Sequence, residues 1–151
     1  MEATYRDKLL ARINRKGWWH VPPADPKAYQ KRGKFLASTF REAEFWGRPL
    51  DTPVHVSIAN PIVGDESTIE TELLGAPSAY PGDNSAKMPQ WQWNLDAKLK
   101  RAALAKGYDS IVLMSCNAYT KFAKEGKIPL SIELNLLCGE LELSNRSERR
   151  K

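Results

Sequence analysis

The sequence has little cysteine and no long apolar run. Its 151 residues include two cysteines, Cys116 and Cys138, which are too few and too isolated for a zinc site or a disulfide framework, so we expect two reduced, partly buried thiols. No segment approaches the roughly 18 consecutive apolar residues of a membrane span, and the first residues lack the basic-then-apolar layout of a signal peptide. We therefore expect a cytoplasmic protein with no membrane partner.

Common short motifs for nucleotides and metals are also missing. The sequence has no Gly-x-Gly-x-x-Gly and no Gly-Lys-Ser or Gly-Lys-Thr, which excludes a Rossmann fingerprint and a phosphate loop. Only two histidines occur, His20 and His55, and no acidic cluster has the spacing of metal ligands. A catalytic metal is therefore not expected.

Positive charge is present in excess, at +5 overall, and it gathers toward the two ends of the chain. The cations form three groups: Arg6, Lys8, Arg12, Arg15 and Lys16; Lys27, Lys31, Arg32 and Lys34; and Arg146, Arg149, Arg150 and Lys151. A solvated helix face with a flexible tail explains this pattern, and so does an acidic or phosphate-bearing partner. Both interpretations stay open.

The length suits one domain, for which we expect residues 1–144, followed by a basic flexible tail at 145–151. Thr4 and Asp7 form a capping-box pattern, and apolar residues at helical spacing predict an N-terminal helix over 4–16. Helices and strands then mix without regular alternation, which predicts an α+β domain. We expect strands at 18–21, 34–37, 54–58, 108–114, 130–136 and 140–143, helices at 41–46, 65–74, 94–106 and 117–125, and a variable loop at 75–93.

A series of short motifs carries the functional signal. They are Trp19-His20-Val21-Pro22, Phe35-Leu36-Ala37-Ser38-Thr39, Ala43-Glu44-Phe45-Trp46-Gly47, Val56-Ser57-Ile58-Ala59-Asn60-Pro61 with Asp65, Ala105-Lys106-Gly107-Tyr108-Asp109-Ser110-Ile111-Val112, and Ser131-Ile132-Glu133-Leu134-Asn135. In this order, over residues 17–143, they resemble the small ADP-ribosyltransferase-like domains of bacteria and phages that have a histidine in the NAD site. The resemblance implies a split antiparallel β-sheet core with short flanking helices.

The resemblance also implies roles for individual residues. Glu133 would be the catalytic carboxylate, and NAD would be the substrate. The residues implied to bind NAD are His20, Phe35, Ser38, Thr39, Phe45 and Trp46. The sequence departs from the family pattern at Pro22-Pro23, at Phe35 in place of a tyrosine, and in lacking a second acid beside Glu133, which argues against transfer to arginine.

Elementary chemistry explains why a carboxylate at position 133 would matter. The bond between ribose and nicotinamide breaks through a cation-like sugar, which a fixed carboxylate stabilises. Leu130, Ile132, Leu134 and Leu136 share one strand face, so Glu133 projects from the other. A glutamate on the solvent face of an edge strand is the alternative. For His20, Phe35, Phe45 and Trp46 the alternative is the hydrophobic core.

Three functions are compatible with the sequence. The first is an NAD-dependent mono-ADP-ribosyltransferase of a phage or mobile-element kind that modifies a macromolecule, with protein favoured over nucleic acid because the cations are not interleaved with aromatics on one surface. The second is an NAD hydrolase or an RNA-directed enzyme of the same fold. The third is an inactive module that binds protein or nucleic acid.

Overall fold

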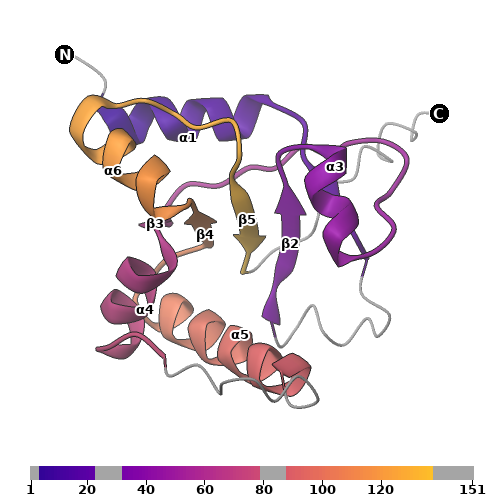
Figure 1. Ribbon diagram of the computed structural model, residues 1–151. Coiled ribbons are helices and arrows are strands. Elements are labelled where there is room, and N and C mark those ends of the chain that lie inside the picture. The colour runs from indigo at the N-terminus through magenta and orange to yellow at the C-terminus, as the bar shows by residue number, and fades with distance from the viewer. Residues whose placement is uncertain (1–3, 23–31, 79–87, 138–151) are drawn as a thin grey trace.

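A five-stranded mixed sheet organises the computed structural model, which describes residues 4–22, 32–78 and 88–137 (Figure 1). The strands are β1 (Trp19–His20), β2 (Lys34–Ala37), β3 (Pro61–Gly64), β4 (Ser110–Leu113) and β5 (Glu133–Leu136), in the spatial order β1-β2-β5-β4-β3. β5 is central and antiparallel to both β2 and β4, whereas β3 and β4 are parallel. The α+β class is confirmed, but the sheet is mixed where an antiparallel core was expected.

Helices cover both faces of this sheet. They are α1 (Tyr5–Arg15), α3 (Phe40–Ala43), α4 (Glu66–Leu74), α5 (Met88–Ala105) and α6 (Cys116–Glu125), with a short 3₁₀ turn η1 (Glu44–Trp46) after α3. On one face, Leu36, Val112 and Leu134 pack against α1 and α6. On the other face, Ile62 and Ile111 pack against α4 and α5, which form the lower layer in Figure 1. The sheet therefore separates two apolar clusters.

The N-terminal helix forms where the capping pattern predicts it. Thr4 accepts a hydrogen bond from the Asp7 amide, and the Asp7 carboxylate accepts one from the Thr4 amide, so both ends of the capping box are made. Leu9 and Ile13 on this helix are fully buried against the sheet. α1 is therefore part of the core rather than an extension attached to it.

The predicted strand at 54–58 does not form. Val54, Val56 and Ile58 are buried as their alternation indicates, but only Val54 is paired, through two 2.7 Å hydrogen bonds with Trp18. The Asn14 side chain binds both backbone groups of Ile58, at 2.8 Å and 2.9 Å. The alternation thus predicted correctly which side chains are buried. The Asn14 side-chain amide, and not a neighbouring strand, forms the hydrogen bonds with the backbone of Ile58. The strand begins later, at Pro61.

The predicted loop at 75–93 is also shorter than expected. α5 begins at Met88 and contains Asn94, which was expected to cap it. Proline at the second helical position is tolerated because its missing amide has no intrahelical partner there.

Residues 79–87, the predicted strand at 140–143, Cys138 and the tail at 145–151 lie outside the described residues. Cys116 is exposed. None of the described helices is both long enough and apolar enough to span a membrane.

Candidate functional site

A small pocket rich in carboxylates lies between the sheet and the helix pair α4 and α5. It encloses about 70 Å³. We call it the acidic pocket and define it by its lining: Glu66, Glu70, Asp96, Glu133, Gln92, Asn135, Phe35, Ile69, Leu95, Leu99, Ile111 and Leu113. None of these lining residues is basic.

Strand register brings Glu133 and Phe35 into this pocket from two strands. Glu133 opens β5 and lies opposite Ala37 of β2 and Leu113 of β4. Phe35 lies opposite Asn135, two residues further along, so its side chain is on the same face as that of Glu133. The predicted parity is therefore confirmed for Ile132, Leu134 and Leu136, whereas Leu130 is 82% exposed and precedes β5, which begins only at Glu133. Because β5 is the central strand, Glu133 is not on an edge strand.

Two carboxyls in the pocket have pKa values near neutrality. Burial raises the pKa of Glu133, the neighbouring Asp96 and Glu66 carboxylates act in the same direction, and together they bring it to about 7. Burial also raises the pKa of Asp96 to about 6, against the opposing effects of a hydrogen bond from Gln92 and the charge of Arg32. The pocket therefore holds protons at a pH where ordinary carboxyls are ionised.

Asn135 adds a buried, unsatisfied polar group beside these acids. Its Nδ2 donates to the Arg32 carbonyl at 2.9 Å, while its Oδ1 is buried with no hydrogen-bond partner among the described residues. The amide lies over Gly33, whose φ of 96° and close approach to the Leu136 carbonyl leave no space for a Cβ. Gly33 thus allows Asn135 to pack tightly next to Glu133.

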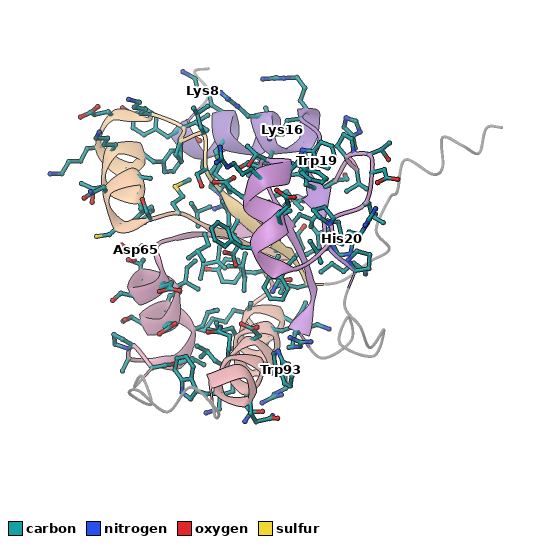
Figure 2. All side chains as sticks on the ribbon, turned by 45° about the vertical axis from the view of Figure 1, so that its right-hand side comes forward. Lys8, Lys16, Trp19, His20, Asp65 and Trp93 are labelled. Atoms are coloured by element: carbon teal, nitrogen blue, oxygen red, sulfur yellow. The ribbon has the colours of Figure 1, made fainter. Side chains whose placement is uncertain are left out.

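His20 lies on the opposite face of the sheet from Glu133. It pairs with Leu36, whose side chain is in the α1 cluster, and it is fully buried. Its Nδ1 is 2.8 Å from the Phe35 carbonyl oxygen, which accepts the ring proton, and burial lowers the pKa of His20. Figure 2 shows His20 next to Trp19, on the side of the molecule away from Asp65 at the start of α4. The structure does not bring His20 into the acidic pocket.

Ser38 and Thr39 belong to a network centred on Glu42. Ser38 Oγ donates to Glu42 Oε1 at 2.8 Å and accepts from the Ile132 amide at 3.0 Å, while Thr39 caps α3. Ser131 Oγ also donates to Glu42. Burial raises the pKa of Glu42, but the hydrogen bonds from Ser131, Ser38 and Thr39 outweigh it and the pKa is lowered. These residues do not line the pocket. They join the end of β2 to the residue before Glu133.

Of the three predicted aromatic residues, Phe35 is the one that lines the pocket. Phe45 lies on η1 and is 88% exposed. Trp46 ends η1, and its side chain is outside the described part of the structure. No sandwich of Phe35 and Phe45 is formed, because Phe45 does not contact the acidic pocket.

Sequence reasoning missed Asp96, Glu66, Glu70 and Gln92. All four come from α4 and α5, and nothing in their spacing distinguishes them from ordinary solvated helix positions. These four side chains lie beside Glu133 only because α4 and α5 pack on the sheet as they do. No group of three or more such side chains in the described residues is arranged to hold a metal ion.

Comparison with known proteins does not assign a function to this site. No protein-family model, curated protein or solved structure matches the chain.

Proposed function

We propose that this protein is an NAD-dependent mono-ADP-ribosyltransferase with an ADP-ribosyltransferase-like fold, acting on a macromolecular acceptor, with protein favoured over nucleic acid. One observation carries the proposal. Glu133 and Phe35 were singled out from two separate motifs, and they line the same pocket on the same face of the sheet. A carboxylate and an aromatic face together suit a flat cationic ring attached to a sugar.

The charge of the pocket supports a cationic substrate. Among the described residues, four carboxylates and no basic residue line it, so the positively charged nicotinamide ring of NAD is attracted there. A cation placed beside Glu133 and Asp96 favours their ionised forms and so lowers both pKa values. Substrate binding thereby generates the carboxylate that the reaction requires.

The reaction breaks the bond between C1′ of the ribose and the ring nitrogen of nicotinamide. The bonding electron pair goes to that nitrogen, which becomes neutral as nicotinamide departs. The Glu133 carboxylate stabilises the cation-like ribose, and an acceptor oxygen or nitrogen forms a new bond to C1′ and loses its proton. With water as the acceptor the same site is an NAD hydrolase, which is the second candidate function.

The pocket is smaller than the ring it is proposed to hold. Its 70 Å³ is less than the roughly 150 Å³ of a cavity that binds benzene. Glu66 and Gln92 are exposed lining residues on different helices, so entry of a ring requires Glu66 to move outward and Gln92 to release its 3.0 Å hydrogen bond to Asp96. His20 does not contact NAD in this proposal. Ser38 and Thr39 have a positioning role: both donate to Glu42, and Ser38 also accepts a hydrogen bond from the amide of Ile132, the residue before Glu133.

The decisive experiment incubates the purified protein with NAD and measures nicotinamide release. Glu133→Gln should keep the fold and bind NAD within a few-fold of wild type, while turnover falls by about two to three orders of magnitude, the usual loss for one transition-state contact. Glu125→Gln, an exposed acid on α6, is the matched control and should react like wild type. Full activity in Glu133→Gln would refute its catalytic role.

A second step separates transfer from hydrolysis. Labelled NAD is added together with cell extract, and the label is followed into protein and into nucleic acid. Label in protein supports the proposed transferase, and free ADP-ribose alone supports the hydrolase. No nicotinamide release under any of these conditions would favour the binding module.

A further inference from the structure

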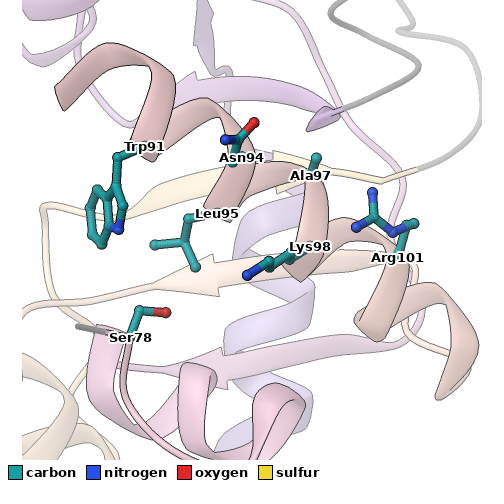
Figure 3. Close-up of a pocket in the computed structure, with 7 residues that line it drawn as sticks. All are labelled: Ser78, Trp91, Asn94, Leu95, Ala97, Lys98 and Arg101. Atoms are coloured by element: carbon teal, nitrogen blue, oxygen red, sulfur yellow. The ribbon is translucent and has the colours of Figure 1, made fainter. Parts of the chain in front are cut away.

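A larger cleft adjoins the acidic pocket between α5 and the segment that carries Ser78. It encloses about 550 Å³, within the range of roughly 300–1,000 Å³ usual for ligand sites. Its polar and aromatic lining consists of Trp91, Asn94, Lys98, Arg101 and Ser78, and we call it the basic cleft. Figure 3 shows Trp91, Leu95 and Lys98 directed from α5 toward the segment that carries Ser78.

The two cavities share a wall. Leu95 lines both of them. The Ser78 amide in the basic cleft donates a 2.8 Å hydrogen bond to Glu70 Oε1, and Glu70 lines the acidic pocket. Leu95 and the Ser78–Glu70 hydrogen bond therefore form the boundary between the two cavities, and one extended ligand that occupied both would displace this contact.

The charge of the lining differs between the two cavities. Among the described residues, the lining of the basic cleft has two cations, Lys98 and Arg101, and no carboxylate, whereas that of the acidic pocket has four carboxylates and no cation. Lys98 and Arg101 are three residues apart on α5, which makes them neighbours on the helix surface. Trp91 lies two turns earlier on the same helix and offers a large aromatic surface at one end of the cleft.

We propose that the basic cleft binds the adenosine diphosphate half of NAD, with the nicotinamide end in the acidic pocket. This inference rests on the proposed function. NAD has the same polarity as the two cavities, since its nicotinamide ring is cationic and its pyrophosphate is anionic. Lys98 and Arg101 bind the pyrophosphate oxygens, and Trp91 stacks on the adenine. Asn94 supplies an amide donor and acceptor to the ribose or the base.

The test uses ADP, which lacks the nicotinamide end and cannot react. Calorimetric titration of wild type with ADP should show binding that weakens as salt is raised, because the contacts are ionic. A Lys98→Gln and Arg101→Gln double variant should bind ADP about tenfold more weakly or worse, the loss expected when charge-assisted hydrogen bonds to phosphate are removed. Trp91→Leu should also weaken ADP binding, whereas Trp91→Phe, which keeps an aromatic ring, should retain most of the wild-type affinity for ADP.

A charge-matched control removes two exposed cations elsewhere. Lys121→Gln with Lys124→Gln on α6 should bind ADP like wild type. In steady-state kinetics the cleft variants should raise KM for NAD with kcat within a few-fold, because the contact is present in ground and transition states alike. No ADP binding by wild type, or equal binding by the Lys98 and Arg101 variant, would overturn the inference.

This design keeps the two proposals separate. ADP binding is measured without turnover, and Glu133→Gln should bind ADP like wild type because the carboxylate is in the other cavity. If ADP binds in the basic cleft and no nicotinamide is released, the cleft assignment stands and the transferase proposal fails. If nicotinamide is released and the cleft variants bind ADP normally, the transferase proposal stands and the cleft assignment fails.

Discussion

At the scale of single residues, Glu133 and Asp96 dominate the behaviour we expect of this protein. Burial withdraws each carboxyl from water and raises its pKa, and for Glu133 the neighbouring Asp96 and Glu66 carboxylates add to the effect. Coupled carboxyls of this kind titrate as a group, and a change to one alters the other. Both activity and stability should therefore depend on pH between about 4.5 and 7.

Activity should rise with pH as Glu133 ionises. In the free enzyme the rise in kcat/KM should have its midpoint near 7, the pKa of Glu133. Asp96→Asn removes a charge that raises this pKa, so the midpoint should move to lower pH. Asp51→Asn, an exposed acid outside the pocket, should leave the profile unchanged. A profile that is the same in Asp96→Asn and wild type would show that Glu133 does not set the rate.

Stability should change with pH in the opposite direction. A carboxyl whose pKa is higher in the folded protein binds its proton more tightly there, so its stabilising contribution is complete below the unfolded pKa and is lost as pH rises through the folded pKa. For Glu133 that window runs from 4.5 to about 7. Near pH 4.5, Glu133→Gln should unfold at the same temperature as wild type. At pH 8 its free energy of unfolding should exceed that of wild type by up to about 3 kcal/mol.

Thermal melts at several pH values measure this difference. Glu125→Gln on α6 controls for the loss of one surface charge and should follow wild type throughout. Parallel stability curves for wild type and Glu133→Gln would mean that the Glu133 carboxyl is well solvated.

The sequence could predict the orientation of Glu133 but not its surroundings. Ile132, Leu134 and Leu136 form one buried face, and that parity is sufficient to place Glu133 on the other, although Leu130, which shares the spacing, is exposed. The sequence does not indicate that Asp96 is buried. It is one of 18 acidic residues, and polar and apolar side chains are interspersed along its helix. Contacts between α5 and β5 are set by tertiary packing, which local patterns do not contain.

At the scale of elements, caps were more informative than alternation. Thr4, Thr39, Asp65 and Ser115 each cap a helix with a side-chain hydrogen bond, so the starts of α1, α3, α4 and α6 follow from short-range chemistry. Strands depend on partners that are distant in sequence. Residues 54–58 alternate like a strand, and the Asn14 amide takes the position that a neighbouring strand would occupy at Ile58.

Asn14 should therefore be important for stability. Asn14→Ala removes one donor and one acceptor and leaves both backbone groups of Ile58 without these partners, at a cost of about 2 kcal/mol or more. Asn117→Ala on the exposed start of α6 is the matched control and should cost little. Chemical denaturation measures both values. A loss below about 0.5 kcal/mol in Asn14→Ala, the range of ordinary surface changes, would contradict this role.

At the scale of the whole molecule, the net charge of +5 invites a nucleic-acid partner, but one of the cations has another role. Lys16 Nζ donates to the Ser38 carbonyl at 2.9 Å and lies 4.7 Å from the centre of the Trp18 ring. Burial lowers the pKa of Lys16, and the nearby charge of Arg12 adds to the effect. Lys16 thus ties α1 to the end of β2, and a test of surface charge should leave it in place.

With a protein acceptor, binding to nucleic acid should be weak and should disappear near physiological salt. Neutralising Lys8, Arg12 and Arg15 on α1 should then change little except the residual affinity at low salt, because few phosphates are contacted. Fluorescence anisotropy with labelled single-stranded RNA and DNA over a series of salt concentrations measures this. Tight, salt-resistant binding that the triple variant loses would instead favour the RNA-directed enzyme.

The central position of β5 also has a consequence for how the chain acquires its fold during synthesis. Ala37 and Glu133 are neighbours across β2 and β5, although about 100 residues separate them, a stretch that takes roughly 5–20 seconds to synthesise. β2 and β4 flank β5 and have no direct pairing with each other, so the sheet cannot close until β5 has been made. During that interval the apolar side chain of Leu36 lacks its neighbour Leu134 on β5, so the nascent chain exposes apolar surface and an unpaired strand edge until synthesis has passed residue 136.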